Sequence, residues 1–250
     1  MIRLKNTDEI KRIRDSSRIL VNTFEEIKKY CEPGISTIEL DKIAYGFIVK
    51  NGANPAFLGY QDYPASLCIS VNHEVIHGIP SKRKLKSGDI VSLDLGVELH
   101  GYISDAAITL PVGRISEDAA LLLKVTEECL YLGIQQAVYG NRIRDISEAV
   151  FNHAKNYNYG VVHQFCGHGV GYDLHEEPQI PNYISSGPNP RLKNGLVIAI
   201  EPMINMGTGD IRILDDGWTV ETADKALSAH FEHTIAVFKD HTEILTSLAD

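Results

Sequence analysis

The stretch GDIVSLDLGVELHGYISDAAITL, residues 88–110, decides the fold that we expect for this chain. Two runs of alternating apolar and polar residues, 90–97 and 102–110, flank a short polar connection that ends in Gly101. Alternating runs joined by a short turn are typical of a β-hairpin, in which successive side chains point to opposite faces. The sequence therefore predicts two paired strands at the centre of the molecule.

Two acidic residues lie inside these strands. If Leu99 and His100 form the loop, Asp94 falls directly opposite Asp105 on the same face, with β-carbons roughly 5 Å apart. Like charges in that position repel, so a chain keeps them when they share a proton or hold a cation between them. From the hairpin alone, two solvated acids on an open strand face remain the alternative.

The composition is that of an ordinary globular protein, with 250 residues, of which 44% are hydrophobic and 23% charged. A chain of this length can bury a large core. Its formal charge of −9 argues against a general binder of nucleic acid or of anionic membranes. The local exception is the basic run Lys82–Lys86 (KRKLK), which we interpret as a solvated loop or, alternatively, as a contact for RNA or an acidic protein.

The four cysteines are scattered and include no C-x-x-C pair, which favours a reducing compartment over a disulfide framework. The N-terminus is charged from its third residue and lacks the apolar core of a signal peptide. No apolar run approaches the length of a membrane span. We therefore expect a soluble, cytoplasmic protein that does not bind membranes.

The order of the expected elements repeats along the chain. Helical patterns at 7–31, 36–52, 117–138 and 143–157 come in two pairs, and each pair precedes a set of strand-like runs. The expected strands besides the hairpin are 56–60, 66–71, 72–80, 161–165, 196–200, 211–214, 218–222 and 230–238. This order predicts an α+β fold in a single domain, residues 1–250, with pseudo-symmetric halves at about 1–113 and 114–250.

Three further residues can carry chemistry. His168 lies in GHGVGYDLHEEP (167–178), which we expect to be a glycine-rich loop. Its glycines let the backbone approach a ligand closely, although a flexible loop with a structural histidine is the alternative. Glu201 ends the apolar run VIAI, and Glu232 lies on an alternating strand. A carboxylate at the end of a buried strand is costly unless it faces a cation, a base or a metal, but the strand could also have reached the surface there.

Together, Asp94, Asp105, His168, Glu201 and Glu232 offer oxygen-rich ligation with one nitrogen. Such a set suits Co, Mn, Fe(II) or Zn better than a site that demands thiolates. Because two of the carboxylates are able to bridge, the set favours a pair of divalent metal ions that activate one shared water.

This set, in this order and with these flanks, resembles the type I methionine aminopeptidases of the pita-bread metallopeptidase family. The segments NHEVIHGIP (72–80), GDIVSLDLG, GHGVG, HEEP, EPM, DGWT and EHT match over nearly the whole chain. The resemblance implies a curved antiparallel sheet covered by two helix pairs with pseudo-twofold symmetry, and a dinuclear metal centre. It also implies an enzyme that removes N-terminal methionine from nascent proteins and peptides whose second residue is small. Lacking a helical insertion between Glu201 and Glu232 and an N-terminal zinc-binding extension, the chain is similar to the short bacterial form.

The resemblance also implies a role for each residue. Asp105 and Glu232 would bridge both metals, Asp94 would chelate one, and His168 with Glu201 would complete the other, with Glu201 also expected to accept the proton of the attacking water. His77 and His175 match two catalytic, substrate-facing histidines. The positions that line the methionine pocket are Tyr60, Tyr63, Cys68, Leu174 and Trp218. Leu174 departs from the family, in which Phe is frequent there, so we expect a different pocket wall.

Other readings of the sequence make different predictions. Aminopeptidase P and prolidase resemble this fold but carry a large domain ahead of it, whereas the first helix here is expected close to Met1. A pita-bread binding module that has lost its metals would lack ligands, and all five are present. A plain α+β domain would leave the opposed aspartates, Glu201 and Glu232 unexplained. We expect a monomeric enzyme that acts on N-terminal Met peptides, with Lys82–Lys86 as a candidate ribosome contact.

Overall fold

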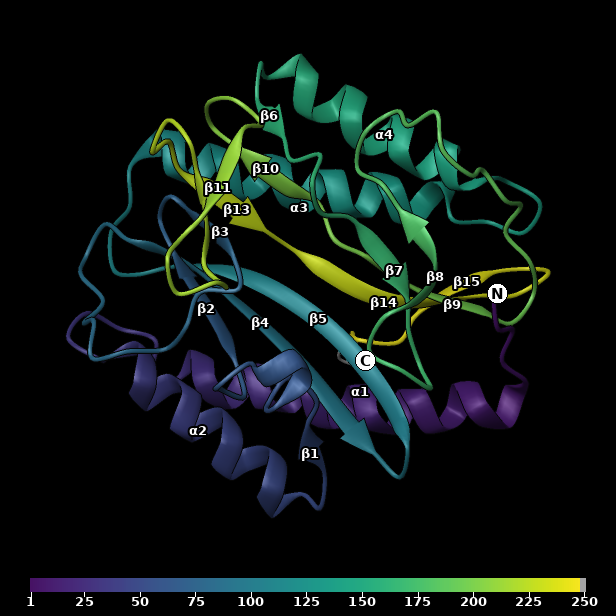
Figure 1. Ribbon diagram of the computed structural model, residues 1–250, viewed down its shortest axis with the longest axis horizontal. Helices are drawn as coiled ribbons and strands as arrows, with labels where there is room; N and C mark the ends of the chain where they lie inside the picture. The colour runs from purple at the N-terminus through teal and green to yellow at the C-terminus, as the bar shows by residue number, and fades with distance from the viewer. Residues whose placement is uncertain (248–250) are drawn as a thin grey trace.

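The computed structural model describes residues 1–247 and shows a curved antiparallel sheet flanked by two pairs of helices (Figure 1). The helices are α1 (Thr7–Lys28), α2 (Thr37–Lys50), α3 (Glu117–Gln136) and α4 (Ile143–Asn156), with a short 3-10 helix at Tyr60–Asp62. The strands are β1 (Asn54–Pro55), β2 (Cys68–Val71), β3 (Glu74–Ile76), β4 (Ile90–Leu99), β5 (Tyr102–Pro111), β6 (Gly160–Val161), β7 (Gly167–Gly169), β8 (Glu176–Ile180), β9 (Leu196–Ile200), β10 (Met203–Asn205), β11 (Ile211–Ile213), β12 (Val220–Thr222), β13 (Ser228–His230), β14 (Glu232–Val237) and β15 (Thr242–Ile244). Within residues 1–247, no helix combines the length and the apolar character needed to cross a bilayer.

The central sheet places strands from both halves of the chain side by side. Its path is β1-β4-β5-β14-β9-β7-β8, with β2 added to β4 and β15 added to β14, and its pairings are antiparallel. Two three-stranded sheets, β13-β10-β6 and β11-β12-β3, complete the β-structure. The predicted hairpin, β4 with β5, therefore lies next to β14, which begins more than a hundred residues later in the sequence.

The four predicted helices are confirmed, and their ends differ from the expected ones by a few residues. The first helix is capped by Asn6, whose side-chain oxygen accepts the N–H groups of Asp8 and Glu9 at 3.0 Å each. The Glu9 carboxylate in turn accepts the N–H of Asn6 at 2.7 Å. Glu39 accepts the N–H of Ser36 in the same way at 2.9 Å. These reciprocal bonds satisfy backbone donors that a helix start leaves unpaired.

The helix pairs cover one face of the sheet, α1 and α2 over the first half and α3 and α4 over the second. The apolar contacts of the first pair include Leu20, Phe24 and Leu40 with Leu93 and Leu95 of β4; those of the second include Leu130 and Ile146 with Ile198 and Ile200 of β9. Fully burying one such side chain stabilises the fold by roughly 1.5–3 kcal/mol. Because side chains alternate along a strand, Asp94, between Leu93 and Leu95, faces away from the helices.

Several of the expected strands are wrong or shortened. Residues 56–60 form a turn, because Gly59 adopts a φ of 81° and the 3-10 helix follows. Of the runs 161–165 and 72–80, only the parts in β6 and β3 are extended. The segment 167–178, which we expected to be a glycine-rich loop, contains β7 and the start of β8. By contrast, the expected strand 196–200 coincides with β9.

Candidate metal centre and substrate cavity

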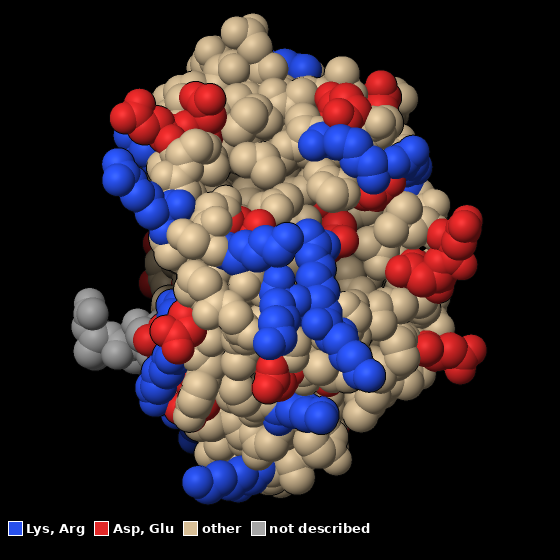
Figure 2. Space-filling view, turned by 90° about the vertical axis from the view of Figure 1, so that its left-hand side faces the viewer, with Lys and Arg blue, Asp and Glu red and all other residues tan. Residues whose placement is uncertain are grey.

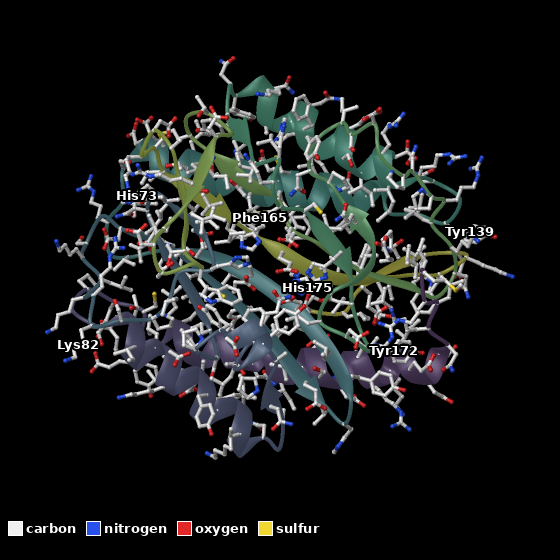
Figure 3. All side chains as sticks on the ribbon, in the orientation of Figure 1. His73, Lys82, Tyr139, Phe165, Tyr172 and His175 are labelled. Atoms are coloured by element: carbon white, nitrogen blue, oxygen red, sulfur yellow. The ribbon has the colours of Figure 1, made fainter. Side chains whose placement is uncertain are left out.

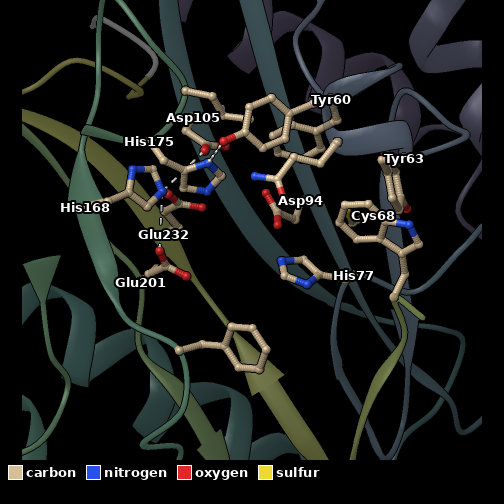
Figure 4. A pocket seen from close by; sticks show the side chains of 15 residues that line it. Tyr60, Tyr63, Cys68, His77, Asp94, Asp105, His168, His175, Glu201 and Glu232 are labelled. Atoms are coloured by element: carbon tan, nitrogen blue, oxygen red, sulfur yellow. Dashed lines mark hydrogen bonds and ion pairs between the residues drawn. The ribbon is translucent and has the colours of Figure 1, made fainter. Parts of the chain in front are cut away.

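One cavity of about 310 Å³ brings together the residues predicted from the sequence (Figure 4). Its lining includes Tyr60, Tyr63, Cys68, His77, Asp94, Asp105, His168, Leu174, His175, Glu201, Trp218 and Glu232, together with Phe57, Gln61 and Phe165. Every candidate site residue is therefore present at the same place in the fold. Asp105, Glu201, Glu232 and His168 lie on one side of the cavity, Tyr63 and Cys68 lie on the other, and Asp94 lies between them (Figure 4).

The five predicted metal ligands come from five neighbouring strands. Asp94 lies on β4, Asp105 on β5, Glu232 on β14 and His168 on β7, and Glu201 directly follows β9. These strands are consecutive in the central sheet, so each delivers one ligand to the same face. Residues distant in the sequence thus meet through strand pairing alone.

The register of the hairpin differs from the expected one by two residues. Asp94 pairs with Ala107, and Asp105 pairs with Gly96, because the loop consists of His100 and Gly101. Both loop residues have positive φ, 53° and 81°, as the two-residue turn that matches strand twist requires. A shift of two residues keeps both aspartates on the same face, so they are diagonal neighbours instead of directly opposed residues.

A row of paired residues crosses the sheet at this level. Cys68 of β2 pairs with Asp94, Asp94 pairs with Ala107, and Ala107 pairs with Glu232. The alanine between the two carboxylates leaves space there that a larger side chain would fill. The same row joins a thiol at the apolar end of the cavity to the acids.

His168 is buried and held in one tautomer. Its Nδ1–H donates to the carbonyl oxygen of Gly169 at 3.0 Å, so its Nε2 lone pair is left free. That Nε2 atom lies 3.5 Å from Glu201 Oε1 and 3.7 Å from Asp105 Oδ2. Burial, with a smaller effect from His175, lowers the pKa of His168 to about 3, so the ring is neutral near pH 7.

The glycines that flank His168 allow neighbouring strands to approach. A β-carbon on Gly167 would lie 2.4 Å from the carbonyl oxygen of Ala199, and one on Gly169 would lie 2.4 Å from that of Glu177. Such distances are far shorter than normal contacts, so only glycine fits at both positions. His168 is therefore a strand residue whose position is fixed by β8 and β9.

The donor set fits a divalent metal on the evidence of its own unpaired atoms. Within residues 1–247, the buried atoms Asp94 Oδ1, Asp105 Oδ1 and Glu232 Oε1 have no hydrogen-bond partner, and no lysine or arginine lines the cavity. Burial raises the pKa of Asp94 to about 7, and burial together with the neighbouring acids raises the pKa values of Asp105, Glu201 and Glu232 well above their ordinary range. Buried carboxylates in such number are stable as ions only beside a cation. Asp105, His168 and Glu232 each place a ligand atom within 4.8 Å of the others.

The opposite end of the cavity is apolar and aromatic. The rings of Tyr63 and Trp218 meet edge to face at 5.0 Å, and Tyr63 donates its hydroxyl to the carbonyl of Gly78 at 3.0 Å. Cys68 and Leu174 are buried in the same cluster. This end can hold a slender apolar side chain beside polarisable rings.

Two histidines face the cavity from different sides. His77 lies between the rings of Phe165 and Trp218, with centroid distances of 5.5 and 6.0 Å, and burial lowers its pKa to about 4. His175 lies 4.3 Å from the ring of His168, and its Nδ1 is 2.8 Å from the Tyr60 hydroxyl. Figure 3 shows His175 and Phe165 near the middle of the molecule, over the central sheet. Neither histidine belongs to the cluster that the carboxylates form with His168.

Comparison with known proteins agrees with this geometry. A model of metallopeptidase family M24 matches residues 11–239. Methionine aminopeptidase 1 of Bacillus subtilis is 51% identical over 246 residues, covering 98% of this chain and 99% of that protein. The chain belongs to the methionine aminopeptidases of family M24. As an M24 metallopeptidase it is a hydrolase, as the sequence predicted.

Solved structures of the methionine aminopeptidase family share its architecture. The crystal structure of methionine aminopeptidase from Rickettsia prowazekii has a TM-score of 0.96 at 38% identity and covers 99% of this chain and 100% of that one. The prolidase from Pyrococcus furiosus, with a TM-score of 0.81 at 24% identity, covers 99% of this chain and 66% of that one and shares the fold alone. The predicted pita-bread fold is thereby confirmed.

Four residues of this methionine aminopeptidase family member were not anticipated from its sequence. Phe57, Gln61 and Phe165 line the cavity. His230 is 1% exposed, and its Nε2 lies 3.7 Å from Glu201 Oε2. The one signal in the sequence was Gly96 inside a strand: a β-carbon there would lie 2.6 Å from the ring of Phe57.

Proposed function

We propose that the protein removes the N-terminal methionine from nascent proteins and from peptides whose second residue is small. The observation that carries the proposal is the junction of two surfaces in one cavity: Cys68, at the apolar end, pairs directly with Asp94 of the carboxylate cluster. A methionine side chain held at the apolar end would bring the first peptide bond beside the carboxylates. The names of the full-length relatives, which are methionine aminopeptidases, support the same activity.

The methionine side chain would be held by Tyr60, Tyr63, Cys68, Leu174 and Trp218. A flexible thioether suits this lining, because sulfur–aromatic contacts are worth roughly 0.3–1.5 kcal/mol each. Leu174 is smaller than the Phe frequent in the family and keeps the wall apolar. The limit to a small second residue rests on the resemblance to the family.

Two divalent metal ions would be held by Asp94, Asp105, His168, Glu201 and Glu232. We assign Asp105 and Glu232 to both ions, Asp94 to one, and His168 with Glu201 to the other. When bound, such ions lower the pKa of a coordinated water and polarise the scissile carbonyl. Four carboxylates and one imidazole suit Co, Mn, Fe(II) or Zn.

The remaining steps fall to side chains of the chain itself. Glu201 would accept the proton of the attacking water, a role supported by its buried position directly after β9, beside the other carboxylates. If Tyr60 donates its hydroxyl to Nδ1 of His175, Nε2–H of that histidine is free to donate to the developing oxyanion. His77, neutral near pH 7, would contact the departing amide from the other side of the cavity.

The proposal is tested by hydrolysis of Met-Ala-Ser, Met-Leu-Ser and Leu-Ala-Ser peptides with the metal-loaded protein. We expect rapid release of methionine from the first peptide and slow cleavage of the other two. Equal rates on Met-Ala-Ser and Met-Leu-Ser would contradict the selectivity. A folded, metal-loaded protein that releases no amino acid from any of them would instead indicate a binding module.

We further propose that the run Lys82–Lys86 contacts the ribosome while nascent chains are processed. Leu85 is buried, and backbone bonds from Gly34 to Leu85 and from Thr37 to Arg83 fix the run on the start of α2, so its basic side chains point outward. Figure 3 shows Lys82 at the edge of the molecule, and Figure 2 shows lysine and arginine side chains gathered on that side. Sedimentation with ribosomes should weaken in the variant Lys82→Glu/Lys84→Glu and stay unchanged in Lys11→Glu.

We also propose that the protein acts as a monomer in the cytoplasm. Its four cysteines, Cys31, Cys68, Cys129 and Cys166, are free thiols, which suits a reducing compartment. Size-exclusion chromatography with light scattering tests the oligomeric state.

A further inference from the structure

The loop that carries Leu174 and His175 into the cavity is closed by one buried carboxylate. Glu176, the first residue of β8, accepts the N–H groups of Tyr172 and Asp173 on its Oε1 atom, at 2.7 and 3.1 Å. The chain therefore turns back on itself over residues 172–176, with the two cavity residues between the ends of the turn. The Glu176 side chain is 1% exposed.

The other oxygen of Glu176 is bound by the N-terminal segment. Lys5 Nζ donates to Glu176 Oε2 at 2.7 Å, and the Lys5 side chain is also 1% exposed. Arg3 lies 3.2 Å from Oε1 of the same carboxylate and pairs with Asp173. The backbone of Lys5 is fixed in turn, because its N–H donates to the carbonyl of Gly195 at 2.7 Å.

Additional contacts fix Gly171 and Tyr172, the first residues of the loop. Tyr172 donates its hydroxyl to Glu9 Oε1 at 2.6 Å, on the carboxylate whose other oxygen caps α1. Gly171 has a φ of 141°, and a β-carbon there would lie 2.8 Å from Lys5 Cε. The carbonyl of Gly171 accepts the N–H of Ile103 at 2.7 Å, two residues before Asp105.

We propose that Glu176 is a positioning residue: its side-chain oxygen closes the loop 171–176, and the N-terminal segment, residues 3–9, holds the closed loop in place, so that His175 and Leu174 face the substrate. The catalytic part of this inference rests on the proposed function, because it assigns His175 to the substrate. Neither Lys5 nor Glu176 lines the cavity. Both act through the backbone of the loop, so they are positioning residues.

Two double variants separate positioning from plain stability. Lys5→Met/Glu176→Gln removes both charges but keeps a side-chain oxygen that can accept the two loop N–H groups. Lys5→Met/Glu176→Met removes both charges and that acceptor as well. Neither leaves an unpaired buried charge, and replacement of a buried ion pair by apolar residues is often tolerated.

We expect the Gln variant to keep kcat for Met-Ala-Ser within about threefold of the parent. The Met variant should lose about 10- to 100-fold in kcat, since one transition-state donor is worth about 10²–10³ when it is lost completely. Its metal content should stay that of the parent. Amide hydrogen exchange at residues 172–175 should be at least about tenfold faster in the Met variant than in the parent, and it should be unchanged in the Gln variant.

Two further variants keep the test decisive. Tyr172→Phe removes only the hydrogen bond to Glu9, so it tests the contact between the N-terminal segment and the loop even if the Met variant does not fold. Amide exchange in the loop should become faster, and kcat should fall several-fold. Arg14→Met is the matched control, because Arg14 joins α1 to Glu243 on β15 at 2.7 Å, away from the loop. It should change neither loop exchange nor kcat.

A folded Met variant with parental loop exchange and parental kcat would overturn the proposal. Equal losses of kcat in the Gln and Met variants, with unchanged exchange, would overturn it too, since the acceptor would then be irrelevant. Exchange does not depend on substrate, so it is measured independently of the proposed function. If loop exchange is faster in the Met variant but the parent protein cleaves no Met peptide, the catalytic role is overturned and the proposed function is wrong.

Discussion

His168 shows how near neighbours prepare one side chain for its role. The Gly169 carbonyl accepts a hydrogen bond from its Nδ1–H, and burial keeps the ring neutral. The lone pair on Nε2 is therefore free beside Asp105 and Glu201. A neutral imidazole in this tautomer is the form that binds a metal ion. A single backbone carbonyl thus selects the chemistry of this residue.

The two aspartates of the hairpin are predicted to differ in their effect on metal binding. Loss of an outer hydrogen-bond partner of a metal ligand lowers metal affinity by about 10- to 100-fold. Asp105→Asn should weaken both metal sites by more than this and should remove nearly all activity. Asp94→Asn should weaken mainly one site. Calorimetric titration with Mn²⁺ or Co²⁺ measures both. Folded Asp105→Asn protein with two bound metals and normal turnover would refute the shared ligand.

His77 and His175, which we propose face the substrate, are predicted to affect turnover without affecting metal content. His77→Ala and His175→Ala should each lower kcat by about 10²–10³, because each removes a contact to the transition state. Elemental analysis of the purified variants should find the metal content of the parent. Loss of metal in proportion to activity in either variant would make that histidine a ligand.

Residue chemistry was the part of the site that the sequence predicted best. A carboxylate in a buried strand is unusual, so Asp94, Asp105, Glu201 and Glu232 could be chosen as candidates, and the family resemblance selected them over solvated surface acids. The structure places all four at one cavity; their roles as metal ligands stay a prediction. Phe57 and His230 could not be chosen in this way, because a ring or an imidazole in such surroundings is equally typical of a core.

At the scale of elements, local signals explain which predictions were confirmed. Each helix carries an apolar stripe, and α1, α2 and α3 begin directly after Asn6, Ser36 and Ser116, residue types that favour a helix start, so the ends could be placed within a few residues. Strand β7 has two glycines among three residues and no strand propensity of its own; it is extended because β8 and β9 pair with it. The hairpin register depends on a positive φ at His100, which the sequence of the hairpin does not indicate.

Gly96 provides a test of how the hairpin shapes the cavity. Gly96→Ala places a β-carbon 2.6 Å from Phe57 Cε1, so the ring must move. We expect a loss of stability of about 1–3 kcal/mol and a several-fold higher KM for Met-Ala-Ser at parental metal content. Gly46→Ala, in α2 with open space around it, is the control and should leave KM unchanged. An unchanged KM in Gly96→Ala would show that Phe57 does not shape the substrate site.

At the scale of the whole molecule, the site is a product of strand order. Strands β4 and β5 follow one another, but β14, β9 and β7 join them only in the folded sheet. That order could not be read from the sequence, because pairing between distant strands leaves no local pattern; the family resemblance supplied it instead. The division into pseudo-symmetric halves at 1–113 and 114–250 stays a prediction.

Metal-free protein is predicted to lose stability as pH rises through neutrality. The folded-state pKa values of Asp94, Asp105, Glu201 and Glu232 are raised, so folding retains protons that the unfolded chain releases. Their contribution is greatest below the ordinary carboxyl pKa, and that of Asp94 is lost as pH rises through about 7. The ordinary histidine pKa lies below this window, so the buried histidines do not offset the trend.

Thermal unfolding in the presence of EDTA measures this effect. The Tm should fall as pH rises from about 6.5, the ordinary histidine pKa, through about 7, the pKa of Asp94. The increase in Tm on adding metal should grow over the same range, since bound metal replaces the protons. Asp94→Asn should show a shallower fall. A Tm that rises with pH in EDTA-treated parent protein would contradict the raised pKa values.

The central claim is that the carboxylate–histidine cluster holds the metal that makes this cavity a methionine aminopeptidase site. Its most direct test is hydrolysis of Met-Ala-Ser by metal-free protein titrated with Co²⁺, Mn²⁺, Fe²⁺ or Zn²⁺. We predict no activity before addition and a rise in rate that follows the metal bound, absent in Asp105→Asn. Full activity without metal, or saturated metal binding without methionine release, would contradict the account.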